Sequence, residues 1–313
     1  MKISRLFSLI GVFLFVYILL NIDITNMLNI LSKANILLLF LTLLTTALIV
    51  VMKAVKWKML IDLYDKYPLK NSIKAWLMGF SLSMITPARV GDLSRAYHIK
   101  HKIDLSKGIT TVIIDRVIDI TILFCLAIIG FISFVVFLNQ YSGFFLIISV
   151  FFALFLLSVY IFTKKELTKI FLKPIFNRFI PEKHKSKINI TFHDFYSSLG
   201  HAKNHKKNII LAVILTIFTW LISIFQAFLL SMSIGLNVSY MFFLSIIPLI
   251  VLLDILPISI SGIGTRDAAM ILFLSFVSVE KEYAISLSFL ILIFGYISVG
   301  LVGAVLLLKE HMK

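Results

Sequence analysis

Charged residues and turn-forming residues meet at two breaks in an otherwise apolar chain. The first break is PARVGDLSR, residues 87–95, which follows the apolar stretch AWLMGFSLSMIT. The second break is SGIGTRD, residues 261–267. Each break places glycine, arginine and aspartate where a helix starts, and a helix N-terminus beside an arginine is a favourable place for an anion. Inside a membrane the expected anion is phosphate, so both breaks are candidate phosphate sites.

A third group of charges lies in the sequence DRVID. Asp115 and Asp119 are four residues apart and therefore share one helix face, and Arg116 lies beside them. Charges within a membrane helix usually face the bundle and pair, so we expect Arg89 or Arg95 to be the partner. Two interpretations stay open: an ion network that holds helices together, or the polar lining of a path for a headgroup.

Asp254 is the most isolated acid, within the apolar sequence LIVLLDILP. A lone carboxylate inside a membrane is costly and needs a partner, and Arg266 is the nearest candidate. The sequence leaves open whether this pair is a structural salt bridge or a site that couples function to a proton or another ion.

Composition indicates that helices inside a membrane position these charges. Hydrophobic residues make up 60% of the 313 residues and charged residues 14%, whereas soluble domains average about 45–50% and about 25%. Runs of roughly 18–20 apolar residues predict an all-α polytopic membrane protein, with residues 1–313 forming one integral membrane domain. The six full spans expected are about 6–22, 34–52, 109–138, 143–162, 209–231 and 284–308.

Two further apolar pieces, 75–86 and 240–279, do not fit a simple crossing. A helix over the first piece would be about 18 Å long, whereas the hydrocarbon core is about 30 Å thick. This piece is therefore expected to enter the membrane and return, with Pro87 stopping the helix and Gly91 supplying the turn.

The second piece is expected to enter from the opposite face and to unwind at Ser261, Gly262 and Gly264. A new helix should then start near Asp267, with Thr265 as its N-cap. Two broken segments that enter from opposite faces are typical of transporters built from inverted halves, whose binding site lies at the break. The alternative is that both are ordinary glycine and proline kinks in a helix bundle.

Basic residues predict the orientation. Residues 53–107 contain 11 Lys/Arg and 4 Asp/Glu, and residues 163–208 contain 11 Lys/Arg and 3 Asp/Glu. With the four basic residues near the two ends, 26 of the 30 lie on one side. We expect a multi-pass protein of the cell membrane with both termini and the basic loop 163–208 in the cytoplasm. The net charge of +15 is then a topology signal that also favours anionic lipids. It does not predict a nucleic-acid partner, because there is no soluble domain to hold a basic groove.

The sequence shows no metal or nucleotide motif. The single cysteine, Cys125, forms no internal disulfide, and no group of cysteines and histidines has the spacing of a metal site. No P-loop is present. We therefore expect no metal and no cofactor, and we assign no catalytic residue.

Three motifs in this order resemble the membrane region of the lysylphosphatidylglycerol synthases, the multiple peptide resistance factor family, and its stand-alone relatives in bacteria and archaea. That family typically shows P-x-R-x-G-E-x-x-R, then E-R-x-x-D, then G-G-x-G-x-x-E; here these are PARVGDLSR, DRVID and SGIGTRD. The basic KAVKWKML before the first motif is also similar. Aspartate replaces the usual glutamate at Asp92, Asp115 and Asp267, and Ser261 replaces the first glycine.

The resemblance implies a polytopic helical protein that moves a lipid between leaflets, either an anionic lipid or one linked to polyprenyl phosphate. The cations expected to bind its headgroup are Arg89, Arg95, Arg116 and Arg266. The acids expected to support them are Asp92, Asp115, Asp119, Asp254 and Asp267, and the backbone turns are Pro87, Gly91, Ser261, Gly262 and Gly264. Because the chain ends at Lys313 after the last expected span, we expect the cytosolic chemistry that makes aminoacyl-lipid to be absent.

Two other functions stay open. One is a membrane-embedded transferase that acts on a polyprenyl-phosphate sugar, with Asp92 or Asp115 as a base; archaeal relatives are associated with dolichol-linked sugar transfer. The other is an accessory subunit in lipid-linked glycan assembly. Membrane lipids are the expected partners, and assembly as a homo-oligomer is left open.

Overall fold

Helices make up most of the described part of the chain. The computed structural model describes residues 2–138, 204–255 and 261–311, together with residue 259 and short pieces between 150 and 202. Within these residues the chain forms helices joined by turns and no strand, so the expected all-α fold is confirmed. The expected span at 143–162 and the expected loop at 163–208 lie mostly outside the described residues.

Four helical segments of the described chain are long and apolar enough to cross a membrane. They are Ile36–Ile61 (α3), Leu105–Phe134 within α6 (Leu105–Leu138), Lys206–Ser233 (α10) and Lys281–Glu310, which combines α13 (Lys281–Ile291), η2 (Leu292–Ile297) and α14 (Ser298–His311). A multi-pass membrane protein is therefore confirmed. The number of spans is compatible with the expected count of about six, because one expected span is not described and another is bent.

The bent span is formed by α1 (Lys2–Leu20) and α2 (Ile24–Ser32). Gly11–Leu20 and Ile24–Ser32 meet at 91°. Asp23 causes part of this change of direction, because it adopts an extended conformation and its side chain accepts the Asn26 N–H at 3.0 Å as the N-cap of α2. Residues 6–22 are thus one arm of a bent pair rather than a straight crossing.

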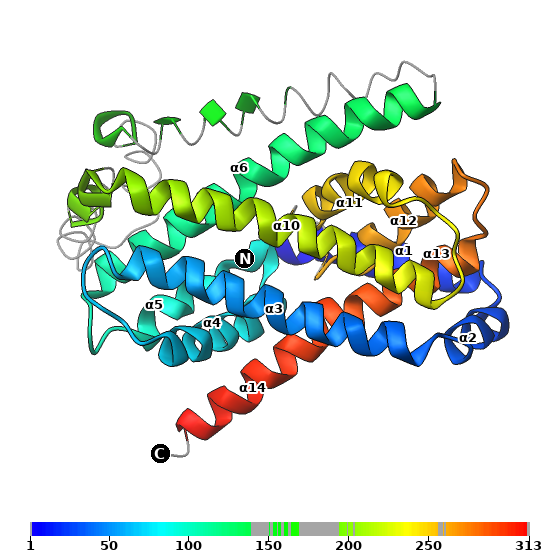
Figure 1. Ribbon diagram of the computed structural model, residues 1–313, viewed down its shortest axis with the longest axis horizontal. Coiled ribbons are helices and arrows are strands. Elements are labelled where there is room, and N and C mark those ends of the chain that lie inside the picture. The colour runs from blue at the N-terminus through cyan, green and yellow to red at the C-terminus, as the bar shows by residue number, and fades with distance from the viewer. Residues whose placement is uncertain are drawn as a thin grey trace.

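The connecting loops gather at two opposite ends of the molecule. In Figure 1 the α3–α4 loop, the α5–α6 loop, the start of α10 and the C-terminal end of α14 lie at the left. The α2–α3, α10–α11 and α12–α13 connections lie at the right. The loops within the basic stretch 53–107 thus lie at one end, together with the start of α10, whereas most of the expected basic loop 163–208 lies outside the described residues. Which end faces the cytoplasm stays a prediction.

The first hairpin starts from the left end of this view. Its helix α4 (Leu69–Met84) begins earlier than the expected piece at 75–86, and it is followed by the 3₁₀ segment η1 (Pro87–Leu93) and by α5 (Ser94–His98). The chain reverses so closely that Gly91 contacts the backbone of Leu82, which leaves no room for a Cβ atom. The Gly91 N–H also donates to the Thr86 hydroxyl at 2.8 Å. The expected turn at Gly91 is confirmed.

The second hairpin starts from the right end. It consists of α11 (Tyr240–Ile255), the turn at residues 261–264, and α12 (Thr265–Ser275), which returns toward the end from which α11 started (Figure 1). The Ser261 hydroxyl, at the turn of this hairpin, donates to the Met84 carbonyl at the end of α4, at 2.8 Å. The two broken segments therefore approach from opposite ends and touch where their helices stop.

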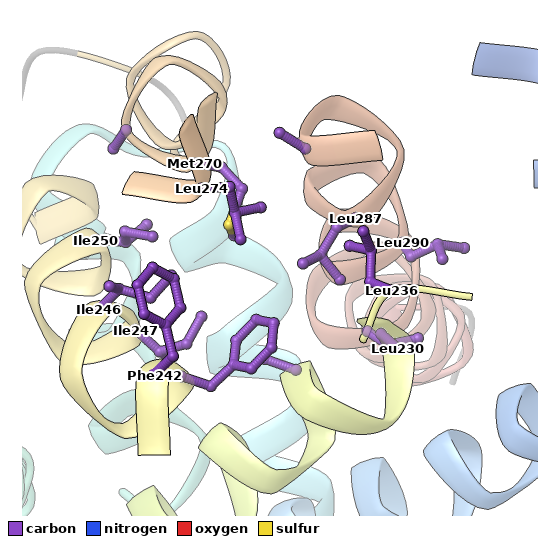
Figure 2. Close-up of a cluster of buried hydrophobic side chains, with 14 of the residues drawn as sticks. Leu230, Leu236, Phe242, Ile246, Ile247, Ile250, Met270, Leu274, Leu287 and Leu290 are labelled. Atoms are coloured by element: carbon purple, nitrogen blue, oxygen red, sulfur yellow. The ribbon is translucent and has the colours of Figure 1, made fainter. Parts of the chain in front are cut away.

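An apolar cluster holds the second hairpin against α10 and α13. Figure 2 shows Phe242, Ile246, Ile247 and Ile250 of α11, Met270 and Leu274 of α12, and Leu287 and Leu290 of α13. Close packing rather than exclusion of water stabilises such contacts in lipid. Glycine contributes in the same way, since Gly130 of α6 lies against the backbone of Ser245 in α11. These contacts place the broken segment at the centre of the bundle.

Candidate functional site

A buried ion network joins α3, α5 and α6. The Lys56 ammonium lies 2.8 Å from Asp115 Oδ1 and also pairs with Asp119, so both acids of the shared helix face have the same partner. Arg95 Nη1 donates to Asp115 Oδ2 at 3.1 Å, and its guanidinium lies 5.0 Å from the centre of the Trp57 ring. Arg89 and Arg95 were the partners expected for Asp115, and Arg95 is the one that contacts it. Lys56 is a further partner that was not expected.

The network continues to the first break through Asp92. Arg116 of α6 pairs with Asp92 of η1, and Arg95 Nε lies 3.8 Å from the same carboxylate. Asp92 therefore lies between two arginines, one from each neighbouring element. The ion pair between Arg116 and Asp92 joins η1 to α6. One arginine of the PARVGDLSR motif takes no part in this network.

That arginine is Arg89. Its backbone has φ +55°, in the left-handed region that costs a residue other than glycine about 1–3 kcal/mol. Its Nη2 donates to the Tyr296 hydroxyl at 3.0 Å, and the guanidinium lies 5.2 Å from the centre of that ring. Among the described residues no carboxylate forms an ion pair with Arg89. A strained arginine without a carboxylate partner is the kind of group that a ligand anion would satisfy.

The second break is organised by Asp267 and Arg266 at the start of α12. The Asp267 carboxylate accepts the Gly264 N–H at 2.8 Å and the Ser288 hydroxyl of α13. Arg266 Nε donates to the same Ser288 oxygen at 2.9 Å. Thr265, expected as the N-cap, is instead the first residue of the helix. Gly264 occupies the cap position because its φ of +87° suits glycine.

Tyr296 connects the two breaks. Its hydroxyl accepts from Arg89 and donates to Asp254 Oδ2 at 3.2 Å, and Arg266 lies 5.5 Å from the centre of its ring. Asp254 therefore contacts Tyr296 rather than Arg266, its expected partner. Tyr296 was not expected at this site, because its sequence is that of an ordinary apolar span. It belongs to η2, a π-helical turn of a kind that is frequent at functional sites.

Two adjoining cavities lie between these groups. The first, of about 120 Å³, is lined by Arg89, Asp254, Arg266 and Tyr296 among others. The second, of about 270 Å³, is lined by Arg89, Asp92, Arg116 and Asp119 among others. The residues shared by both linings are Lys53, Arg89, Trp220 and Val251. The shared residues indicate that a ligand could contact Arg89 from either side.

Lys53 is a second cation that the sequence analysis did not select. It was counted as part of a basic loop after an expected span at 34–52, but α3 continues to Ile61 and carries it into the bundle. Its ammonium lies 6.0 Å from the Trp76 ring centre and 5.5 Å from that of Trp220. Within the described residues it has no carboxylate partner. The sequence did contain a signal for Lys53, because Lys53 begins the stretch KAVKWKML that is similar to the family. That similarity by itself gave no role to the lysine.

The expected site residues therefore separate into two groups. Those that line a cavity are Arg89, Arg116, Arg266, Asp92, Asp119 and Asp254. Arg95, Asp115 and Asp267 lie outside both linings and hold the elements in place. Gly262, with φ +77°, lies directly against the Asp254 carboxylate, and Pro87 begins η1.

Cations exceed carboxylates in this cluster. The cations are Lys53, Lys56, Arg89, Arg95, Arg116 and Arg266, and the carboxylates are Asp92, Asp115, Asp119, Asp254 and Asp267. With all of them ionised, one positive charge is unbalanced. Buried polar atoms without a hydrogen-bond partner in the described structure include Arg266 Nη2, Arg116 Nε and Asp254 Oδ1. Native proteins rarely leave such atoms unsatisfied. An anion would satisfy the two arginine groups, whereas the Asp254 oxygen needs a donor.

The packing of the second break gives a first prediction. Replacing Gly264 by alanine should destabilise the protein by at least about 1–3 kcal/mol, because its φ of +87° is unfavourable for alanine and a Cβ would meet the Gly11 carbonyl of α1. The thermal unfolding midpoint in detergent measures this loss. Gly235→Ala is the control, because Gly235 has φ +80° with nothing within 4 Å of the added carbon. Equal losses in the two variants would contradict the close contact with α1.

Comparisons with known proteins agree with this architecture. The family described as Lysylphosphatidylglycerol synthase TM region matches residues 5–303. The chain is also similar to UPF0104 membrane protein MJ1595 of Methanocaldococcus jannaschii. The two are 28% identical over 286 residues, which cover 85% of this chain and 83% of the archaeal protein.

Proposed function

This chain belongs to the family of the lysylphosphatidylglycerol synthase transmembrane region, and on that premise we propose that it is a flippase-like lipid transporter. Its substrate is an anionic lipid or a lipid linked to polyprenyl phosphate, moved between the leaflets of the cell membrane. In this proposal both termini face the cytoplasm.

The observation that supports the proposal is the position of Arg89. It lies where the two broken segments meet, lines both cavities, and has no carboxylate partner among the described residues. Irregular backbone at membrane depth is tolerated only inside protein or beside a water-filled cavity. A phosphate that enters either cavity can therefore exchange its water for the guanidinium of Arg89 and the ammonium of Lys53.

The surroundings of the cavities fit a lipid headgroup better than a free ion. The linings combine these cations with apolar and aromatic side chains such as Trp76, Trp220 and Val251. The outer surfaces of the spanning helices are apolar, with Phe40 and Phe218 more than half exposed. A headgroup can thus occupy the polar interior while its hydrocarbon chains stay beside the bundle.

Transport in liposomes tests the proposal. Purified protein should speed the transbilayer movement of fluorescent phosphatidylglycerol or of fluorescent polyprenyl phosphate, measured by quenching of the outer-leaflet label with dithionite. Zwitterionic phosphatidylcholine is the control lipid and should move more slowly, because its ammonium competes for the same phosphate. Equal rates with and without protein, for every anionic and polyprenyl lipid, would refute transport.

The same vesicles separate transport from the other two functions. Supplying a sugar-linked polyprenyl phosphate with an acceptor lipid and analysing products by mass spectrometry detects a transferase. A new glycolipid without altered sidedness would favour the transferase. Activity of the isolated chain would count against a purely accessory role.

A further inference from the structure

Asp254 is a buried carboxylate with one unsatisfied oxygen. Its side chain lines the first cavity, and the residue is 5% exposed. Oδ2 accepts a hydrogen bond from Tyr296, whereas Oδ1 has no partner among the described residues. Gly262 packs against Oδ1 of this carboxylate, so that a side chain at this position would collide with it.

The charges that face Asp254 come from three elements. Arg89 of η1 is connected to it through the Tyr296 hydroxyl, Tyr296 of η2 contacts it directly, and Arg266 and Asp267 of α12 lie nearby. Neither arginine forms an ion pair with Asp254 in the described structure. The carboxylate therefore interacts electrostatically with the same two cations that face the cavity.

The geometry points to a proton rather than a metal ion as the species that Asp254 binds. A metal ion needs several converging oxygen ligands, and the described residues contain no group of three or more acidic, histidine or cysteine side chains suited to one. Two nearby arginines also repel a metal cation. The 120 Å³ cavity is large enough to hold water, through which a proton can reach Oδ1.

We propose that Asp254 is a proton-binding site coupled to the anion site formed by Arg89 and Arg266, so that an anionic headgroup and a proton bind together. This inference rests on the proposed function. A carboxylate and a phosphate compete for the same two guanidinium groups. Neutralising Asp254 leaves both cations to the phosphate, and a bound phosphate in turn favours the neutral acid.

This coupling is reciprocal and has a definite sign. Affinity for the anionic lipid should rise as the pH falls, by at most about tenfold per pH unit where one proton is taken up per lipid. A gradient of protons across the membrane would then bias the direction in which the lipid moves. The coupling supplies an energy source without a nucleotide.

Calorimetry of lipid binding tests the proposal directly. Phosphatidylglycerol is titrated into detergent-solubilised protein at one pH in two buffers that differ in protonation enthalpy, so the difference in heat counts the protons taken up. This probe is a phosphodiester and lacks the second phosphate ionisation near pH 6 of a monoester. Any pH dependence therefore comes from the protein. The wild type should take up close to one proton per lipid where Asp254 is ionised in the empty protein.

Variants identify the group that takes up the proton. Asp254→Asn should bind phosphatidylglycerol at every pH with at least the affinity of the wild type at low pH, and should take up no proton. Asp104→Asn is the matched control, because Asp104 is a solvent-exposed acid paired with Lys107. It should keep the wild-type proton count.

The possible failures are distinguishable. Binding that depends on Arg89 but takes up no proton in the wild type would overturn the proton site and leave lipid transport intact. This result needs no Asp254 variant, so it holds even if Asp254→Asn fails to fold. A proton count that persists in Asp254→Asn would also overturn it. If phosphatidylglycerol, with polyprenyl phosphate as a second probe, shows no binding that differs between the wild type and Arg89→Gln, the anion site at Arg89 fails and the proton coupling fails with it. Transport itself is refuted separately, by equal rates with and without protein in the liposome assay.

Discussion

Replacing Lys56 by methionine should lower the free energy of unfolding by about 3–5 kcal/mol. Lys56 is 1% exposed and is the shared partner of Asp115 and Asp119. Methionine fills much of the same volume but leaves Asp119 without the ammonium that neutralises it. An uncompensated buried charge is strongly destabilising, whereas the net contribution of an intact buried pair is small. Chemical or thermal unfolding in detergent measures the loss.

A neighbouring lysine on the same helix provides the control for this prediction. Lys58 pairs with Asp62, and both side chains are partly exposed, at 28% and 25%. Lys58→Met should cost at most about 1 kcal/mol, because water screens that pair. Adding Asp119→Asn to Lys56→Met should recover part of the lost stability by removing the orphaned charge. Similar losses for Lys56→Met and Lys58→Met would mean that the network does not hold α3 to α6.

The architecture was predictable because its signals are local. Length and hydropathy located the four long spans that the structure describes. Residues 75–86 are too short to cross the membrane, and this indicated a segment that returns to its starting side. Gly91 and Gly264 marked the turns, since one sits against a neighbouring backbone and the other needs a positive φ. These properties depend on neighbouring residues in the sequence, so a single sequence contains them.

The pairing of the charges was less predictable because it depends on helix ends and on packing. The expected span at 34–52 placed Lys56 outside the membrane, whereas α3 continues to Ile61 and buries it. Lys56 can be buried within α3 because it pairs with Asp115 and Asp119. Hydropathy takes no account of such pairing, so it predicted an end of the span that is too early. Asp254 and Arg266 were expected to pair because both are charged, but Tyr296 lies between them and contacts Asp254 itself.

The two arginines of the PARVGDLSR motif also differ in a way that the motif does not show. Arg95 is fully buried against Trp57 and paired with Asp115. Arg89 has a left-handed backbone, lines both cavities and takes no part in that network. The same motif thus contains Arg95, which joins α5 to α6, and Arg89, which lines the cavities where we propose that a ligand binds.

Replacing Arg89 by glutamine should reduce protein-dependent transport of anionic lipid by about tenfold or more. A hydrogen bond to a charged group contributes about 1.5–3 kcal/mol, and about 1.4 kcal/mol corresponds to a factor of ten. Glutamine keeps a polar side chain that can reach Tyr296 but lacks the positive charge. Arg89 forms no ion pair among the described residues and is connected to Asp254 only through the Tyr296 hydroxyl. Its removal therefore breaks no salt bridge, and the thermal midpoint should stay near that of the wild type.

The dithionite assay in liposomes measures this effect, and two further variants decide its cause. Lys102→Gln removes an exposed cation paired with Asp65 at 3.0 Å and should leave transport unchanged. Arg95→Gln should instead lower the thermal midpoint, because it leaves Asp115 with only one of its two cations. If Arg89→Gln transports lipid at the wild-type rate while remaining folded, Arg89 does not bind the headgroup. Within the described residues Lys53 is the other cation that lines both cavities, so the site would then have to depend on Lys53 or lie elsewhere in the bundle.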